Sequence, residues 1–292
     1  MSALASDRYC CLAASEWHRV LAQSKAGVCV DPRPCDFEQV WKGASDEMPA
    51  GTEPRFIPWE ELDVPLPHRG ARCWGYALTY PEHRRETIDA AHFRFLKKGS
   101  VESNSAPIPF RDFLDYELEI GLLLHRDTPD RYGYFLANDL TDRGLQVDHY
   151  NARNPAPGFT IAKDFSGSLR AGPLLLVGDA SIWPQLTATL LLNGLQRQVI
   201  RATDCNVHPH LMHRELFREH DEEPWLLAAT GTTSGTMFRS PRIREKLRAM
   251  VAGGLSMRRA RRRWLQQLSY LTRGDKLVMA SPMLGRSETE VI

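Results

Sequence analysis

Residues 115–125 read DYELEIGLLLH, and the alternation of charged and apolar side chains in this stretch predicts a β-strand. Because side chains on a strand point alternately to its two faces, one face would carry the carboxylates of Asp115, Glu117 and Glu119. The opposite face would be apolar and would pack on a core: Tyr116, Leu118, Ile120 and Leu122. The stretch therefore predicts a sheet against a core and a local concentration of negative charge.

The three carboxylates of this strand need compensation, because like charges so close together repel one another. A hard divalent cation such as Mg²⁺ or Mn²⁺ would provide it, since these ions prefer carboxylate oxygens as ligands. The alternative is a solvent-facing acidic strand whose side chains pair with basic neighbours. Residues 115–125 taken alone favour that alternative, so the metal hypothesis needs support from elsewhere in the chain.

Further short apolar or alternating runs lie on both sides of this strand, separated by residues that favour turns. They read RCWGYAL at 72–78, FRFLKK at 93–98, GPLLLVG at 172–178, LTATLLLNG at 186–194, WLLAATGT at 225–232 and DKLVMASP at 275–282. Apolar residues at helical spacing also predict two late helices, one over 243–251 and one over 257–268. The chain is therefore expected to be an α+β protein that is predominantly β.

The first 70 residues differ from the rest and are predicted to form a small N-terminal region and linker. Apolar residues at i, i+4, i+7 and i+8 from Ala13 predict a helix over 7–26, and a strand is predicted over 27–31. Residues 44–69 are acidic and contain several prolines, which predicts a linking loop. Residues 71–292 would then form the main domain.

The composition excludes several classes of protein. The chain has 292 residues, with 37 Lys and Arg against 36 Asp and Glu, so its net charge of +1 predicts no general attraction to nucleic acid or to an acidic membrane. No run reaches the roughly 18 apolar residues of a membrane span, and Asp7 and Arg8 interrupt the apolar core that a signal peptide would need. The six cysteines include no C-x-x-C pair and are expected to stay reduced. We therefore expect a cytoplasmic protein.

Three other segments carry side chains that could serve chemistry, although each has an ordinary structural explanation. ANDLTDRGLQ at 137–146 contains Asp139, Arg143 and Gln146, but the same composition is typical of turns. Lys163 in IAKDFSG has the residue type of a solvated surface position. TGTTSGT at 230–236 could bind an anion through its backbone N–H groups, yet such loops are common without a function.

GYALTYPEHRRET at 75–87 contains a fourth candidate. Tyr80, His83 and Glu86 are three residues apart, so on a helical turn they would share a face. Glu86 could then orient His83 and raise its basicity, as a partner of a general base does. The alternative is an exposed helical turn whose charges form local ion pairs, and the spacing alone favours it.

Taken in order, these segments resemble the motif pattern of the fumarylacetoacetate hydrolase superfamily. The matching residues are Gly75, Tyr80, His83 and Glu86, then Phe95-Leu96-Lys97, Asp115-Tyr116-Glu117-Leu118-Glu119, Asn138-Asp139-Leu140-Thr141-Asp142-Arg143 with Gln146, Lys163-Asp164-Phe165, Gly172-Pro173, Asn193-Gly194 with Gln198, Thr230-Gly231-Thr232, Gly274-Asp275, and Leu284-Gly285 with Val291. The resemblance spans roughly residues 71–292 and depends on the ordered set. It implies a fold of mixed β-sandwich and roll with a small N-terminal domain, and commonly a homodimer.

The resemblance also implies a role for individual residues. Three carboxylates would bind Mg²⁺ or Mn²⁺: Glu117, Glu119 and Asp139. Four residues would contact a bound keto acid: Tyr80, Arg143, Gln146 and Thr232. Lys163 would face negative charge that develops on the substrate, and His83 with Glu86 would form a catalytic dyad on a mobile lid.

The activity implied by the resemblance is hydrolytic cleavage of a C–C bond in a small 2-oxo acid or 1,3-dicarbonyl acid, of the acylpyruvate or fumarylpyruvate type. The bond would break to give a metal-bound enolate, because a divalent cation stabilises the developing oxyanion as a Lewis acid. The same enolate chemistry without an activated water gives decarboxylation, isomerisation or dehydration, so these reactions, in a specialised biosynthetic pathway among others, are the alternative.

Several positions depart from the superfamily pattern and leave the substrate open. They are Thr79, Lys98, Gly144 and Thr233, together with the lack of Pro-Gly-Asp before Thr230. A catalytically idle member that binds a metabolite or a partner is a further alternative, although every charged residue of the expected site is present.

Two segments have no place in the pattern. His208, His210 and His213 could suggest zinc, but no thiolate or carboxylate completes a convincing set, so a surface element is the better interpretation. Residues 242–263 carry nine Arg or Lys residues and one Glu, including RRARRR at 258–263. A solvated helix face is the favoured interpretation, and a docking site for an anionic partner or a phosphate-bearing substrate is the alternative.

Overall fold

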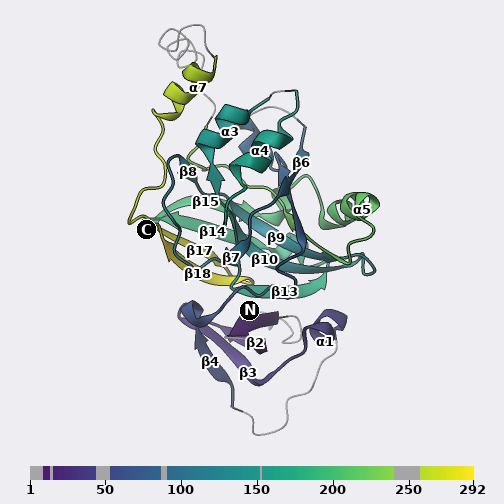
Figure 1. The fold of residues 1–292 in the computed structure, drawn as a ribbon. Coiled ribbons are helices and arrows are strands. Elements are labelled where there is room, and N and C mark those ends of the chain that lie inside the picture. Colours follow the sequence, from purple (N-terminus) through teal and green to yellow (C-terminus); the bar gives the residue numbers. More distant parts are fainter. Residues whose placement is uncertain (1–8, 14–15, 44–52, 87–90, 152, 240–256) are drawn as a thin grey trace.

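The chain forms a predominantly β structure in which a large sheet packs against a smaller one (Figure 1). This computed structural model describes residues 9–13, 16–43, 53–86, 91–151, 153–239 and 257–292. Within that part of the chain, no helix is long and apolar enough to cross a membrane. The expected fold class, α+β and mostly strand, is confirmed.

The large sheet has twelve strands, ten of them in the order β4-β3-β2-β1-β13-β10-β9-β16-β5-β6. In chain order, the strands of this sheet are β1 Tyr9–Ala13, β2 Glu16–Gln23, β3 Gly27–Pro34, β4 Arg55–Pro58, β5 Arg72–Ala77, β6 Phe93–Lys97, β7 Val101–Ser103, β9 Leu118–His125, β10 Arg131–Asp139, β12 Leu169–Ala171, β13 Leu174–Asp179 and β16 Trp225–Ala229. β12 pairs with β10 and with β7, beside the main path. All the strands predicted by apolar alternation are present, whereas β10, whose end was interpreted as a turn, was missed.

A second sheet of four strands closes the core, in the order β15-β14-β17-β18. Its strands are β14 Thr187–Leu192, β15 Leu195–Arg201, β17 Lys276–Ser281 and β18 Gly285–Glu290. A two-stranded ladder joins β8 Leu114–Asp115 to β11 Thr141–Asp142 at the edge of the site described below.

Strand β9 is buried on both faces, and its side chains alternate as predicted. Leu118, Ile120, Leu122 and Leu124 join the main core between the two sheets, whereas Leu123 joins a second core on the other face. The carboxylates of the predicted acidic strand are therefore inside the protein, and its solvent-facing alternative is wrong. The backbone leaves regular strand geometry at residues 116–117, between β8 and β9.

The predicted helix over 7–26 is wrong, because the described residues of this range form β1 and β2 with a turn into β3. Strand β1 pairs with β13, with Cys10 opposite Leu175, so the N-terminal strands continue the large sheet. This non-local pairing buries Tyr9, Cys10 and Cys11 and outweighs a helical spacing that only a few apolar residues supported. The strand predicted over 27–31 is confirmed as part of β3.

The region predicted as a linking loop contains structure as well. β4 pairs with β3, and a short 3-10 helix, η2 Trp59–Glu61, follows. Trp59, Leu62 and Leu66 are buried, so apolar contacts order a segment that its prolines and acidic residues made look irregular. Residues 44–52 lie outside the described part of the chain.

The helices are short and lie around the sheets (Figure 1): α1 Phe37–Lys42, α2 Pro81–Glu86, α3 Arg143–His149, α4 Ala156–Ala162, α5 Pro209–Glu219 and α7 Met257–Leu265, with 3-10 turns η3 Trp183–Gln185 and η4 Ala202–Asp204. The predicted helix over 257–268 is confirmed by α7, although it ends three residues earlier. The predicted helix over 243–251 lies outside the described residues. Helices α3, α4 and α7 gather at one end of the large sheet, where the acidic strand begins.

Candidate functional site

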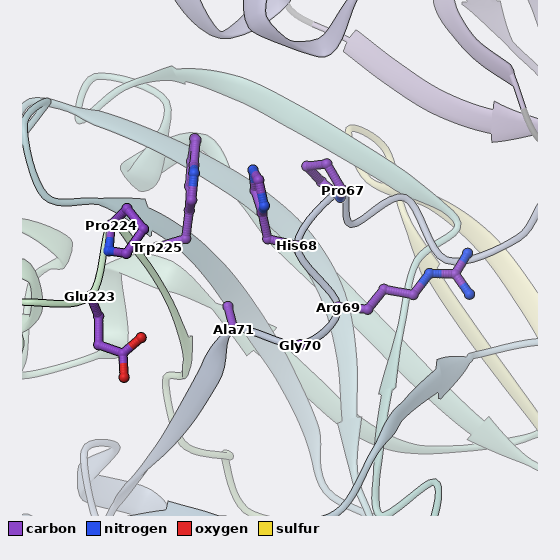
Figure 2. A pocket seen from close by; sticks show the side chains of 8 residues that line it. All are labelled: Pro67, His68, Arg69, Gly70, Ala71, Glu223, Pro224 and Trp225. Atoms are coloured by element: carbon purple, nitrogen blue, oxygen red, sulfur yellow. The ribbon is translucent and has the colours of Figure 1, made fainter.

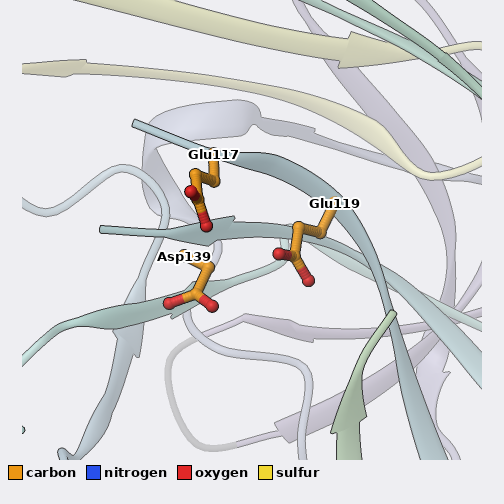
Figure 3. A group of neighbouring side chains, drawn as sticks. All are labelled: Glu117, Glu119 and Asp139. Atoms are coloured by element: carbon orange, nitrogen blue, oxygen red, sulfur yellow. The ribbon is translucent and has the colours of Figure 1, made fainter. Parts of the chain in front are cut away.

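Three buried carboxylates meet where β9 begins and β10 ends (Figure 3). Potential ligand oxygens of Glu117, Glu119 and Asp139 lie within 4.8 Å of one another, and all three residues are buried. The ladder explains their meeting, because Glu119 pairs with Ala137 and the Asp139 N–H donates to the Glu117 carbonyl at 2.9 Å. Among the described residues, this is the one such group of three potential metal ligands.

Two buried lysines contact these carboxylates. Lys163 Nζ lies 2.5 Å from Glu117 Oε2 and 2.6 Å from Asp139 Oδ2, and Lys97 Nζ contacts Asp139 Oδ1. Lys163 follows α4, and Ser168 Oγ fixes its backbone by donating to its carbonyl at 2.6 Å. The prediction that Lys163 belongs to the site agrees with this placement. Lys97 was part of the Phe95-Leu96-Lys97 motif but was given no role.

Arg143 is the third buried cation and begins α3, which Asp142 caps through its side chain. Its Nη2 lies 2.7 Å from Asp115 Oδ2 and 2.5 Å from Glu117 Oε1, and its Nη1 donates to Gln146 Oε1 at 2.8 Å. The helix therefore places Arg143 and Gln146 together beside the carboxylates.

The site has more buried carboxylates than buried cations. Its buried carboxylates are Asp115, Glu117, Glu119 and Asp139, and its buried cations are Lys97, Lys163 and Arg143. Burial raises the pKa of Glu117, but Lys163 and Arg143 outweigh burial and lower that pKa to about 2. Burial and the neighbouring Asp139 instead raise the pKa of Glu119 well above its ordinary value, against a smaller effect of Lys163.

The protein therefore stabilises the ionised form of Glu119 less than that of Glu117. Glu119 Oε2 accepts a hydrogen bond from the Gly231 N–H at 2.9 Å, which is weak compensation for a fully buried charge. A hard cation among the three carboxylates would supply the missing charge, and oxygen atoms are the ligands that Mg²⁺ and Mn²⁺ prefer. The residues present therefore fit a divalent cation held by Glu117, Glu119 and Asp139.

Helix α2 brings His83 to the same site. His83 is buried, and burial together with Arg143 and Lys163 lowers its pKa to about 4, although Glu117 acts in the opposite direction. Glu86, its predicted partner, contacts the 230–236 loop, where Glu86 Oε2 accepts a hydrogen bond from the Gly235 N–H at 3.1 Å. The structure thus places His83 near the charged cluster and Glu86 on the 230–236 loop.

The other two predicted substrate contacts are held in internal hydrogen bonds or in the core. Thr232 Oγ1 donates to the Leu118 carbonyl at 2.8 Å and accepts from Gln198 Nε2 at 2.9 Å. Gln198 also accepts from the Leu118 N–H at 2.9 Å, so it ties the 230–236 loop to the acidic strand. Tyr80 is 1% exposed, and burial raises its pKa well above the ordinary range. Gln198 belongs to a matching motif, but the sequence does not predict that it joins the 230–236 loop to the acidic strand.

The two segments outside the motif pattern have structural partners. His213 lies on α5, and its Nε2 is 2.9 Å from the His125 carbonyl, so a zinc site finds no support here. On α7, Arg262 forms an ion pair with Asp148 of α3 at 2.5 Å, and Arg261 lies over the Tyr150 ring at 5.3 Å. Part of the basic segment therefore contacts this chain itself.

A separate surface pocket of about 520 Å³ lies where residues 67–71 meet residues 223–225 (Figure 2). The His68 ring stacks on Trp225 at 4.4 Å on one side of it, and Glu223 and Arg69 lie at its rim. Its lining contains none of the carboxylates or cations described above. The candidate site is therefore the charged cluster and not this pocket.

Comparison of the sequence with models of known protein families identifies a family for this chain. The family model described as fumarylacetoacetate (FAA) hydrolase C-terminal matches residues 72–292. No match was found among curated proteins.

Several solved structures share the fold over nearly the whole chain. A probable 2-hydroxyhepta-2,4-diene-1,7-dioate isomerase from Mycobacterium abscessus has a TM-score of 0.62 at 17% identity, covering 97% of this chain and 98% of its own. The fumarylacetoacetate hydrolase of the psychrophile Exiguobacterium antarcticum has a TM-score of 0.63 at 17% identity, with 97% and 98% covered. Maleylpyruvate hydrolase from Sphingobium sp. SYK-6, in complex with manganese(II) and pyruvate, has a TM-score of 0.58 at 15% identity, with 98% of both chains covered.

Identities this low support the shared fold alone, but the family model covers most of the chain. The ordered motifs, the buried carboxylates and the sheet architecture agree with that match. The chain therefore belongs to the fumarylacetoacetate hydrolase family.

Proposed function

We propose that this protein is a divalent-metal-dependent hydrolase that cleaves a C–C bond in a small 2-oxo acid or 1,3-dicarbonyl acid, of the acylpyruvate or fumarylpyruvate type. The observation that carries the proposal is the buried group of Glu117, Glu119 and Asp139, which offers a set of hard oxygen ligands in a site that has more carboxylates than cations.

The charges of the site support an anionic substrate. Four ionised carboxylates, three cations and a divalent ion would leave one positive charge in the protein interior. A buried unpaired charge is costly, so a substrate that carries a carboxylate would be favoured over a neutral one. The relative from Sphingobium, solved with manganese(II) and pyruvate, also supports a 2-oxo acid and leaves the choice between Mg²⁺ and Mn²⁺ open.

The residues of the site have separate tasks in such a reaction. A bound divalent cation would act as a Lewis acid on the oxo acid. Arg143 and Gln146 would bind the substrate carboxylate, and Lys163 would offset negative charge that develops as the C–C bond breaks. With a pKa near 4, His83 is neutral at pH 7, so its imidazole can accept a proton from the water that attacks the second carbonyl. The electron pair of the broken bond stays on the oxo-acid fragment, which then takes up a proton.

A second candidate uses the same chemistry: isomerisation, decarboxylation or dehydration of a related oxo acid, all of which can proceed through an enolate. In these reactions, His83 would move a proton of the substrate and would not activate a water molecule. The isomerase among the similar structures fits this alternative.

The experiment that separates these functions is a substrate panel assayed in the metal-loaded protein. Acylpyruvates, fumarylpyruvate, oxaloacetate and 2-oxo-3-deoxy acids are incubated with Mn²⁺ or Mg²⁺, and products are identified by mass spectrometry. Metal-dependent release of two acids from an acylpyruvate supports the hydrolase. Turnover of oxaloacetate or of the deoxy acids alone supports the alternative, and no turnover with intact binding of the oxo acids supports an idle binding protein.

We also propose that the protein is a cytoplasmic homodimer that binds neither membranes nor nucleic acid, as the family resemblance and the balanced charge imply. Sedimentation equilibrium of the purified protein tests the oligomeric state, because the measured mass of a dimer would be twice the 33.1 kDa of one chain.

A further inference from the structure

We propose that Phe238 positions the guanidinium group of Arg143. Trp264 of α7 packs against Phe238, so α7 contributes to the structure of the site. The inference rests on the proposed function only in taking Arg143 as a group that binds the substrate carboxylate. It gives a role to the basic segment around residues 258–263 that involves no external partner.

The loop at residues 237–238 holds Arg143 in two ways. The Met237 and Phe238 N–H groups donate to Asp115 at 2.9 Å and 3.1 Å, and Asp115 in turn binds the Arg143 guanidinium. The Phe238 ring also covers that guanidinium, with Arg143 Cζ 5.0 Å from the ring centroid. An arginine over an aromatic face is attracted by the ring and loses access to water on that side.

Phe238 has a support of its own in α7. Its ring meets the Trp264 ring edge to face, with centroids 5.1 Å apart and an interplanar angle of 86°. This geometry is favourable for aromatic pairs. Trp264 is 4% exposed and belongs to a small apolar cluster with Ala260 and Leu265 of α7 and Val147 of α3.

Helix α7 also contacts α3, the helix that carries Arg143. Arg262 pairs with Asp148 at 2.5 Å, near the end of α3, while Arg143 stands at the start of the same helix. The apolar contact through Val147 lies between these two points. Helix α7 thus restrains the C-terminal end of α3, and through Trp264 it supports the Phe238 ring over Arg143, which favours an orientation of the guanidinium group toward Asp115 and Glu117.

The test compares Phe238→Leu, which keeps an apolar side chain but removes the ring, with Phe238→Tyr, which keeps the ring. Phe37→Leu is the matched control, because Phe37 is 7% exposed and belongs to the other core, away from the site. Loss of the cation–π contact is expected to raise KM for the oxo acid roughly fivefold in Phe238→Leu, with kcat little changed, since such contacts have modest strength. Phe238→Tyr and Phe37→Leu should keep the wild-type KM.

Two further measurements show whether the ring acts through Arg143. In an Arg143→Lys background, Phe238→Leu should raise KM no further, because the positioned group is already gone. In ¹H–¹⁵N spectra, the Arg143 Nε–H signal, assigned with Arg143→Lys, should carry a ring-current shift that Phe238→Leu removes and Phe238→Tyr retains. This spectrum needs no substrate or metal, so it reports on the positioning even if the proposed function is wrong.

A KM that rises equally in Phe238→Leu and Phe37→Leu, or that rises further in the Arg143→Lys background, would overturn the proposal, because the effect would then be one of general stability. An Arg143 signal that is unchanged by Phe238→Leu would overturn it as well.

Discussion

The ammonium group of Lys163 lies 2.5 Å from Glu117 Oε2 and also reaches Asp139, so one lysine joins a carboxylate just before β9 to a carboxylate at the end of β10. Both partners are fully buried, and the interaction explains why the pKa of Glu117 falls to about 2 in spite of burial. Lys163 therefore has a structural task in addition to the role in the reaction that we propose for it.

Replacing Lys163 with Met should destabilise the metal-free protein, because two buried carboxylates would lose their shared cation. The free energy of unfolding should fall by roughly 3 kcal/mol, which is typical of a broken buried ion pair, and Mn²⁺ should restore part of it. Urea unfolding with and without Mn²⁺ measures both effects. Lys98→Met is the control, since Lys98 is exposed, and equal destabilisation by the two variants would argue against the structural task.

Glu117→Gln and Glu119→Gln should differ in the metal-free protein, although both should bind metal poorly. Glu119 has a raised pKa, so Gln resembles its protonated form and should change stability by less than about 0.5 kcal/mol. Gln at position 117 would remove one of the two carboxylates that each of Lys163 and Arg143 contacts and should cost roughly 3 kcal/mol. Thermal unfolding of the two variants, made and measured side by side, checks the difference, which the opposite order of stability would contradict.

Metal affinity gives a separate prediction for the same position. Loss of the Glu119 carboxylate should weaken Mn²⁺ binding by about 100-fold, since even residues that only support a ligand commonly affect affinity that much. Isothermal titration of metal-free wild type and Glu119→Gln measures it. Equal Mn²⁺ affinity in the two proteins would show that the metal, if any, binds elsewhere.

The pH dependence of stability should reveal His83. Its folded pKa of about 4 lies below the ordinary 6.5, so the unfolded chain takes up a proton more readily than the folded one. The stability that neutral His83 contributes is complete above pH 6.5 and is lost as the pH falls toward 4, by up to about 3 kcal/mol. The difference in unfolding free energy between wild type and His83→Gln, measured from pH 7 to pH 4 without metal, should change over this window. A constant difference would contradict the burial of an uncharged imidazole.

The sequence predicted the central strands well, because their apolar alternation is a local property. Residues 118–125 and 225–229 form strands within the predicted segments, the apolar residues Leu118, Ile120 and Leu122 face the core as predicted, and residues 257–265 form a helix within the predicted one. The N-terminal strands were missed because their pairing with β13 is non-local, while Trp17 and Val20 happen to fit a helical spacing.

The motifs predicted the members of the site better than their contacts. Lys163 and Arg143 contact Glu117, and Gln146 contacts Arg143, so residues from separate motifs lie together. The attachment of Glu86 to Gly235 depends on how the 230–236 loop folds over α2, which no local pattern contains. The support of Arg143 by Phe238 likewise joins residues 95 positions apart, so sequence spacing could not have predicted it.

The central claim is that a metal held by Glu117, Glu119 and Asp139 is required to cleave the C–C bond of an oxo acid. The most direct measurement is the rate of pyruvate release from acetylpyruvate by metal-free protein as Mn²⁺ is added back. We predict no release without metal, a rate that rises to a plateau at one Mn²⁺ per chain, equal amounts of acetate and pyruvate, and no plateau in Glu119→Gln. Pyruvate release that is the same with and without Mn²⁺, or that is unchanged in Glu119→Gln, would contradict the account.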